Sequence, residues 1–216
     1  MDIVDIIYRT VYNAQVDEKN SVKETIEERA LELFSVKGYE GVSVSELSEA
    51  AGITKPTLYY YFGSKEGVFE AVIQSHYSRL NTIIAESAVY HPRPKSYHED
   101  IFKTLTGVTA AYFSFARENE AFYRITLANL SMPASSVVFE IVKKYHFTQF
   151  DIIDGMFRSM AKVHGNLRGK HQTLTWSFIG TMNSYISLYF SGVSRQELHD
   201  KNVRELVHQF MHGIYA

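Results

Sequence analysis

The fold is decided by residues 43–66, which read SVSELSEAAGITKPTLYYYFGSKE. Ser43 and Glu46 have the spacing of a capping box, in which each side chain binds a free backbone N–H at the start of a helix. Thr54 takes the capping position before a second helix. Gly52 lies in the short turn between the two, where its missing side chain permits a sharp reversal. The stretch therefore predicts two short helices joined by a glycine-containing turn, the helix-turn-helix pattern.

The helix that follows Thr54 combines an apolar face with a polar one. Leu58 and Phe62 are four residues apart and share the face that packs inward. The side chains expected on the outward face are Lys55, Thr57, Tyr59 and Tyr60. Two adjacent exposed tyrosines are costly for a protein unless something covers them, and their hydroxyls and rings suit phosphate and thymine-methyl contacts. We therefore expect this helix to enter the major groove of DNA.

Apolar residues at helical spacing extend the prediction in both directions from this segment. A preceding helix begins at Ser21, ends at Gly38 and Gly41, and has one apolar face formed by Val22, Ile26, Ala30, Leu33 and Phe34. The short helix after Ser43 directs Leu47 and Ala50 inward, and another begins at Ser64 and runs to about Val89. Further helices are expected near residues 97–118, 119–131, 135–161, 172–191 and 195–214. Three more capping-box pairs mark helix starts: Ser21–Glu24, Ser96–Glu99 and Ser194–Glu197.

Composition agrees with an all-α protein of about nine helices. Of 216 residues, 45% are hydrophobic and 21% charged, and only four are proline, a balance that allows a buried core and few helix breaks. The absence of cysteine excludes disulfides and thiolate zinc sites and suits a cytoplasmic protein. The acidic first residues argue against a secretion signal. Residues 172–194 carry no charge, but their many Thr, Ser, Asn and Gln side chains favour a buried interface helix over a membrane span.

Net charge opposes the nucleic-acid interpretation at first sight. The chain carries a formal charge of -2, and residues 21–66 hold five basic side chains against eight glutamates. From Ala51 to Lys65, however, there are two lysines and no acid, so the recognition element is locally positive. Acids on the far faces of the other helices are compatible with binding, although they weaken long-range steering.

The sequence resembles the TetR family of regulators. The residues that carry the likeness are Gly38-Tyr39, Val44-Ser45-Glu46-Leu47 and the run from Ala50 to Glu66, with its specific Leu-Tyr-x-x-Phe-x-x-Lys-Glu pattern. The resemblance implies a homodimer that reads a palindromic operator in double-stranded DNA, most often a repressor released by a small-molecule effector. It implies DNA contacts by Thr54, Lys55, Thr57, Tyr59 and Tyr60, and phosphate contacts by Ser43 and Lys65. The expected domains are an N-terminal extension (1–20), a helix-turn-helix domain (21–66) and a larger ligand-binding and dimerisation domain (67–216).

Aromatic residues crowd the C-terminal helices, as they do around small-molecule sites and also in ordinary cores. The residues proposed to line a ligand pocket are Tyr112, Tyr123, Phe147 and Trp176. Because few charges lie nearby in the sequence, we expect an apolar or weakly polar effector. The last two helices are expected to form the dimer interface, because small residues in the first of them allow a partner helix to approach closely. The interface candidates are Ser177, Thr181, Ser184, Tyr185, Leu188, Leu206 and Phe210.

Two other functional classes remain open at this point. A structural DNA-binding protein that acts at many chromosomal sites would use the same recognition helix. A metal-dependent enzyme would use Glu205, His208 and His212, which share one helix face at spacings that can hold zinc. That order of ligands is not the His-Glu-x-x-His protease motif, and no phosphate loop, dinucleotide fingerprint or nucleophile elbow is present. We therefore expect a regulator with neither enzymatic activity nor a cofactor or metal.

Overall fold

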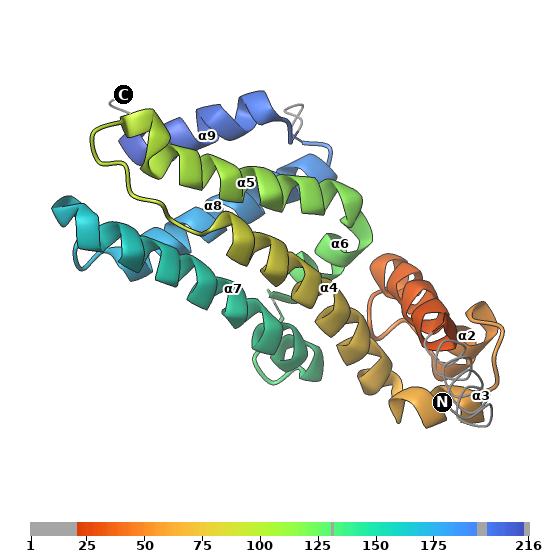
Figure 1. Ribbon diagram of the computed structural model, residues 1–216. Coiled ribbons are helices and arrows are strands. Elements are labelled where there is room, and N and C mark those ends of the chain that lie inside the picture. The colour runs from red at the N-terminus through yellow and green to blue at the C-terminus, as the bar shows by residue number, and fades with distance from the viewer. Residues whose placement is uncertain (1–20, 131, 194–197, 214–216) are drawn as a thin grey trace, which may run out of the picture. The chain divides into compact units, whose positions relative to one another are not determined.

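The computed structural model describes residues 21–130, 132–193 and 198–213, and the regular structure in these ranges is entirely helical (Figure 1). The helix over residues 21–37 is followed by α2 (Val44–Ala50), α3 (Lys55–Phe62), α4 (Lys65–Ser87), α5 (Ile101–Glu118), α6 (Glu120–Leu130), α7 (Val137–Val163), α8 (His171–Phe190) and α9 (Asp200–His212). Two short 3-10 turns, η1 (Tyr97–Glu99) and η2 (Gly165–Leu167), precede α5 and α8. The predicted all-α fold with about nine helices is confirmed for the described residues. The predicted extension, residues 1–20, lies outside them.

The chain divides into two compact units, of which the first ends at Ile73 and the second begins at Gln74. This boundary falls inside α4, so one continuous helix contributes its first turns to the N-terminal unit and its remaining turns to the C-terminal unit. The functional division at residue 66 stays a prediction, because packing alone does not say which residues bind DNA.

The core of the N-terminal unit is built around three aromatic rings. Phe34, Tyr39 and Phe69 lie with ring centroids 5.2 to 5.8 Å apart. The apolar face predicted for the first helix is buried at Ile26, Ala30 and Phe34. The prediction for α2 is only half right: Leu47 is buried, but Ala50 is exposed.

The inward position next to Leu47 in α2 belongs to Ser48 instead. Its hydroxyl donates to the carbonyl of Val44 at 2.9 Å, and this bond is what allows a polar side chain to be buried in so short a helix.

In the C-terminal unit, α5 lies alongside α9 and α7 lies alongside α8 (Figure 1). Phe157 of α7, Phe178 of α8 and Phe210 of α9 meet with centroids 5.1 to 6.3 Å apart, which joins three of these helices in one apolar core. None of the described helices is sufficiently long and apolar to cross a membrane. The uncharged stretch from residue 172 forms, in its described part, most of α8.

The capping boxes differ in outcome. The Ser43–Glu46 box is complete. The Ser96–Glu99 box is wrong: the Ser96 side chain makes no capping bond, its carbonyl accepts from the Glu99 N–H in a 3-10 turn, and α5 begins only at Ile101. Ser21 already lies within its helix and so is not at the capping position, while Ser194–Glu197 lies outside the described residues.

Candidate nucleic-acid interface

The start of α2 is held by an exposed network centred on Glu46. The Ser43 hydroxyl accepts from the Glu46 N–H at 3.2 Å, and the Glu46 carboxylate accepts from the Ser43 N–H at 2.9 Å. Lys37, at the end of the first helix, donates to the same carboxylate at 2.7 Å. The bonds from Lys37 and from the Ser43 N–H and hydroxyl lower the pKa of Glu46 to about 2. The Ser43 hydroxyl is therefore committed to the cap, and its predicted phosphate contact stays a prediction.

The turn into α3 is closed by backbone bonds. Gly52 takes a φ of 66°, in the left-handed region that glycine enters without strain, and the Ile53 N–H donates to the Ser48 carbonyl at 2.9 Å. Thr54 caps α3 because its hydroxyl accepts from the Thr57 N–H at 3.3 Å, and the two hydroxyls lie 2.8 Å apart. Both helices of the pair thus begin on side-chain caps, which fixes the direction of α3.

The outward face of α3 is strongly apolar for a surface. Leu58 is fully buried, whereas Tyr59 is 47% and Tyr60 69% exposed. The Tyr60 ring meets the Tyr61 ring edge to face at 5.2 Å. Lys55, in the first turn, is also exposed. The structure therefore brings Lys55, Tyr59 and Tyr60 onto accessible surface of one short helix, as a groove-binding helix requires.

Lys65 has a different position from the one that the sequence suggested. Its ammonium donates to the carbonyls of Tyr39 and Val42 at 3.1 and 3.2 Å and lies 4.1 Å from the centroid of the Tyr39 ring. These contacts tie the loop before α2 to the first turn of α4, so Lys65 positions the helix pair. Its contact with a DNA phosphate stays a prediction. The sequence from Ala51 to Lys65 holds two lysines, and in the described structure only Lys55 has an ammonium without such internal contacts. The positive charge available to DNA in this segment therefore rests mainly on Lys55.

Gly67 is a positioning residue that the sequence reasoning missed. A Cβ added to it would lie 1.9 Å from the carbonyl oxygen of Phe62, the last residue of α3. The Gly67 N–H donates to the Ser64 hydroxyl at 3.1 Å, which caps the start of α4. The backbones of α3 and α4 therefore approach within a distance that only glycine allows. The sequence did contain a signal for this role, because glycine lowers helix propensity and is unexpected in the first turn of a predicted helix.

The four residues proposed for a ligand pocket separate into two pairs. Tyr112 of α5 and Tyr123 of α6 are both buried in the C-terminal unit, where the Tyr123 ring lies 6.2 Å from that of Phe115, one turn after Tyr112 on α5. Phe147 and Trp176 are 53% and 62% exposed. The structure does not bring them to the buried pair, and their part in ligand binding stays a prediction.

The proposed dimer residues also separate by helix. On α8, Ser177, Ser184 and Leu188 are exposed, and Thr181 and Tyr185 are less accessible. On α9, Leu206 is buried within its own chain, and Phe210 packs on Phe157 and Phe178. The apolar stripe of α9 thus packs into the core of its own chain, and the dimer contact of Leu206 and Phe210 stays a prediction. The exposed candidates lie on α8.

The His208 and His212 rings of α9 lie 4.6 Å apart. Within the described ranges, no three His, Asp or Glu side chains are placed to share a metal ion. The cluster Glu205, His208 and His212 that the enzyme alternative needs is therefore not assembled by this structure.

Comparison with known proteins relates the helix pair to one family model. Residues 26–72 match the model described as "Bacterial regulatory proteins, tetR family". The biofilm operon icaADBC HTH-type negative transcriptional regulator IcaR of Staphylococcus aureus is 36% identical over 63 residues, which cover 29% of this chain and 34% of that protein. The uncharacterized HTH-type transcriptional regulator YdgC of Bacillus subtilis is 33% identical over 92 residues, 43% of this chain and 46% of that protein. The matched segments thus span from a third to just under a half of these relatives.

Solved structures share the fold over most of the chain. The regulator FadR from Bacillus subtilis, solved in complex with stearoyl-CoA, has a TM-score of 0.73 at 16% identity and covers 88% of this chain and 98% of that one. The regulator PfmR from Thermus thermophilus has a TM-score of 0.65 at 20% identity, with the same coverage. At these identities the likeness concerns the fold.

Proposed function

Because residues 26–72 match the model of the tetR family of bacterial regulatory proteins, we propose that this chain is a ligand-responsive transcriptional repressor that binds a palindromic operator as a homodimer. A transcription regulator with a DNA-binding helix-turn-helix is the part that the family supports directly. The operator symmetry, the effector and the release by ligand are the proposal.

The observation that carries the proposal is the outward face of α3. The exposed Tyr59 and Tyr60 stand beside exposed Lys55 on a helix whose start is fixed by Thr54. A large aromatic surface left open on a rigid, capped helix is costly in water and is compensated when a partner covers it. In a major groove, the rings would cover thymine methyl groups, and the hydroxyls and the ammonium would reach phosphates.

A palindromic operator requires two copies of this helix, which a homodimer supplies. The exposed face of α8 favours such a dimer, because Ser177, Gly180 and Ser184 leave room for a second α8 to approach while Leu188 and Trp176 add apolar surface. Half-sites on B-DNA recur about 34–36 Å apart, so the spacing of the two reading helices determines affinity.

Ligand response is proposed to pass through α4. This helix carries Lys65 at one end and buried Tyr77 in the C-terminal unit, so a ligand that displaces α4 among the C-terminal helices acts on the same helix whose first turn holds Gly67. A ligand that favours a spacing of the two reading helices that does not match the half-sites lowers the affinity for the operator. Binding of the operator lowers the affinity for the ligand by the same factor, and the coupling free energy is typically about 1–3 kcal/mol. The effector is proposed to be apolar or weakly polar, since buried Tyr112 and Tyr123 are the candidate residues of the interior.

The test is binding of the purified protein to DNA from upstream of its own gene, measured by fluorescence anisotropy against random DNA of equal length. Tyr60→Ala is expected to weaken specific binding by about 1–3 kcal/mol, roughly 5- to 150-fold, since a base-reading side chain is removed. Val36→Ala is the matched control: Val36 is an 83% exposed apolar residue of the helix over 21–37, and its removal should leave affinity within about twofold, as surface changes usually do.

Equal affinity of Tyr60→Ala and the unaltered protein would contradict α3 as the reading helix. Selection from random DNA then separates the remaining cases. One palindromic consensus supports a promoter-specific repressor, whereas dispersed sites without symmetry favour the structural DNA-binding role.

A further inference from the structure

Three buried tyrosine hydroxyls, from three different helices, lie inside the C-terminal unit. They belong to Tyr77 of α4, Tyr112 of α5 and Tyr123 of α6, all of which are buried. Burial is the main cause that raises the pKa of each, and the hydroxyls of Tyr77 and Tyr112 raise the pKa of Tyr123 further. The Phe122 ring lies against the rings of Tyr77 and Tyr123, and against that of Phe115, one turn after Tyr112 on α5. We call Tyr77, Tyr112 and Tyr123 the tyrosine cluster.

The members of the cluster differ in whether their hydroxyls are bonded. The Tyr77 hydroxyl lies 3.1 Å from Nδ1 of His146 on α7. Among the described residues, the hydroxyls of Tyr112 and Tyr123 have no hydrogen-bond partner, and neither has that of Thr109, which lies one turn before Tyr112 on α5 and is fully buried. Buried hydroxyls are nearly always bonded in folded proteins, so three orphaned ones in a single unit indicate an intended partner.

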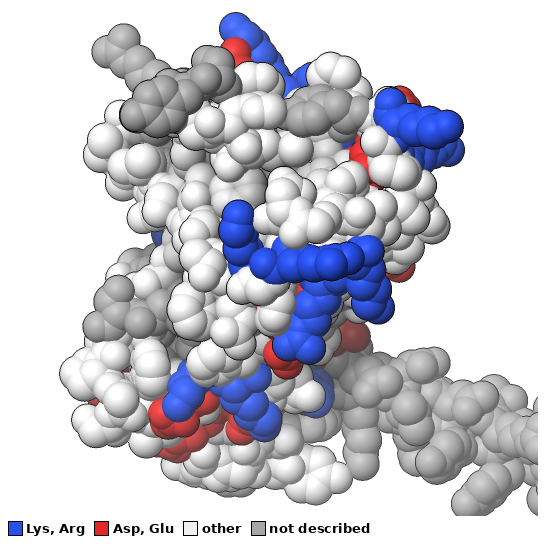
Figure 2. All heavy atoms as spheres, turned by 90° about the vertical axis from the view of Figure 1, so that its left-hand side faces the viewer, with Lys and Arg blue, Asp and Glu red and all other residues white. Residues whose placement is uncertain are grey.

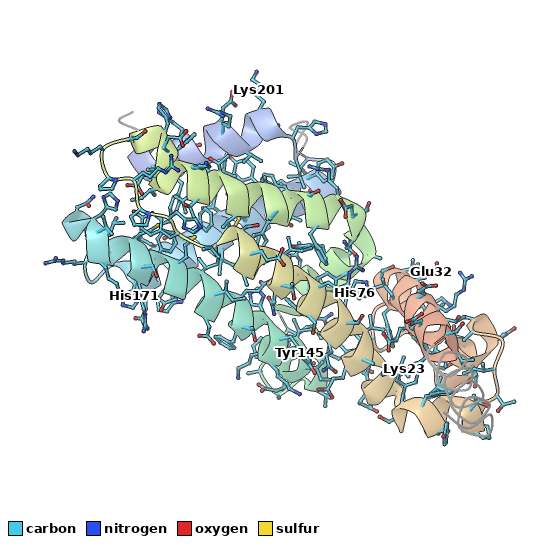
Figure 3. The ribbon with its side chains drawn as sticks, viewed as in Figure 1. Lys23, Glu32, His76, Tyr145, His171 and Lys201 are labelled. Carbon is cyan, nitrogen blue, oxygen red and sulfur yellow. The ribbon has the colours of Figure 1, made fainter. Side chains whose placement is uncertain are left out.

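Aromatic rings surround the cluster. The Phe122 ring meets those of Tyr77, Phe115 and Tyr123 at centroid distances of 5.0, 6.1 and 5.6 Å. On the α7 side, Tyr145 stacks on Tyr77 at 6.5 Å, and the labels of Tyr145 and of His76, which stacks on Phe122, locate this region in Figure 3. Orphaned hydroxyls inside an aromatic wall have the composition of a small-molecule site, with a few polar groups that orient an apolar body.

The interior carries no compensating charge for an ion. Asp100 is the one charged side chain among the described residues that is buried, and it is bonded to Tyr90 and His164. Burial also lowers the pKa of His146 to about 4, so its imidazole is neutral. Lysine and arginine side chains lie instead on the surface, as the face in Figure 2 shows. Arg93, Lys103 and Arg158 are among the exposed ones. The guanidinium of Arg79 lies 5.8 Å from the centroid of the Phe115 ring, but Arg79 is exposed, so a carboxylate or phosphate moved into the cluster would lose its hydration without gaining a buried cation.

We propose that Tyr112, Tyr123 and Thr109 bind the head group of an uncharged ligand that presents a hydrogen-bond-accepting oxygen, such as a ketone, ester or amide carbonyl. Its apolar body lies against Phe115 and Phe122. This inference rests on the proposed function in taking the C-terminal unit as the sensor, and it specifies the chemical class of the effector. In this arrangement the hydroxyls donate and the carbonyl oxygen of the ligand accepts.

The first experiment needs no ligand and compares three isosteric variants by thermal unfolding of the full-length protein. Tyr112→Phe and Tyr123→Phe each remove an orphaned buried hydroxyl, and each is expected to raise the unfolding midpoint by about 2 °C or more. Tyr77→Phe is the matched control. It removes a bonded hydroxyl and with it the contact to His146 Nδ1, so it is expected to lower the midpoint. A lower midpoint in Tyr112→Phe and Tyr123→Phe as well would show that their hydroxyls already have partners, and would overturn the proposal.

The second experiment uses three probes of matched size: acetophenone, ethylbenzene and benzoate. Acetophenone is expected to raise the midpoint of the unaltered protein more than the other two at equal concentration, since it alone combines an uncharged body with an accepting oxygen. In Tyr112→Phe and Tyr123→Phe, its advantage over ethylbenzene is expected to disappear. Equal shifts from acetophenone and ethylbenzene, a larger shift from benzoate, or no shift from any probe would overturn the proposal.

These readouts are independent of DNA. Failure of the protein to bind a specific operator would remove the proposed function while leaving the probe series intact. Conversely, normal operator binding with no preference for acetophenone would refute only the proposed chemical class of the ligand.

Discussion

Gly67 shows how strictly a single position constrains the candidate interface. The carbonyl oxygen of Phe62 occupies the place that a Cβ at residue 67 would need, at 1.9 Å. That carbonyl belongs to the last residue of α3 and cannot move without turning the helix that carries Tyr59 and Tyr60. The tight connection between α3 and α4 is therefore a property of this glycine.

Gly67→Ala is expected to destabilise the protein by about 2 kcal/mol, because a forced backbone shift costs as much as an overpacked core. Gly155→Ala on α7 is the control, since nothing lies within 4 Å of a Cβ at that position. It is expected to stabilise by about 0.5–1 kcal/mol through helix propensity. Chemical denaturation of both variants measures the difference, and equal effects would refute the steric account of Gly67.

Glu46 links stability to pH at the start of α2. Hydrogen bonds from Lys37 and from the Ser43 N–H and hydroxyl lower its pKa from 4.5 to about 2 in the folded protein. A carboxylate with a depressed folded-state pKa contributes stability that is fully present above its unfolded-state pKa of 4.5 and is lost as pH falls towards 2.

We therefore expect the unfolding midpoint of the unaltered protein to fall more steeply between pH 4.5 and pH 2 than that of Glu46→Gln. The difference should shrink in high salt, because the pair with Lys37 is solvent-exposed. Midpoints measured across this range at two salt concentrations test it. Parallel curves for the two proteins would mean that the capping network contributes nothing to the pH response.

At the scale of elements, α8 and α9 differ, although the sequence predicted that both form the dimer interface. The apolar residues Leu206 and Phe210 of α9 pack within the same chain. The exposed positions of α8 recur every three or four residues, at Ser177, Gly180, Ser184 and Leu188, and so form one continuous stripe. This stripe can accept a partner helix without unpacking the core.

Ser184→Arg is expected to convert the proposed dimer into a monomer at micromolar concentration, since an unpaired charge at the centre of a close helix contact costs about 3 kcal/mol or more. Thr148→Arg, at another exposed position, on α7, should remain dimeric. Sedimentation velocity of the two variants distinguishes these states. A dimeric Ser184→Arg protein would place the interface away from this stripe.

At the scale of the whole molecule, charge sets how the protein meets DNA. The chain has a formal charge of -2, and Lys55 is the lysine of α3 that is exposed. Because so few cations are available, we expect the affinity of the protein for DNA to depend only weakly on long-range electrostatic attraction. It should depend mainly on how Tyr59 and Tyr60 fit into the groove.

We expect Lys55→Ala to reduce the magnitude of the slope of log K against log salt by about 2, one phosphate contact for each subunit of a dimer. Lys65→Ala is compared in the same titration, with circular dichroism to verify its fold. An unchanged slope shows that Lys65 only positions the helices, and a second reduction supports its predicted phosphate contact. A slope that Lys55→Ala leaves unaltered would remove Lys55 from the interface.

What the sequence by itself determined is local. The cap of α2 at Ser43, the cap of α3 at Thr54 and the turn at Gly52 follow from side chains within a few residues of each other, so the helix pair and its exposed tyrosines could be predicted. The order of the later helices followed from their apolar spacing for the same reason, with ends correct to within about two residues for most of them.

Only the tertiary structure decided which surfaces cover which side chains. Apolar spacing marks residues that avoid water, but a partner far along the chain determines whether a residue such as Leu206 is buried in its own core and Trp176 is left exposed. Lys65 has the pattern of a free cation in the sequence, yet it is bound by two carbonyls that lie 26 and 23 residues earlier. The orphaned hydroxyls of Tyr112 and Tyr123 likewise arise from the meeting of separate helices, because hydrogen bonding depends on distances that spacing along one helix does not contain.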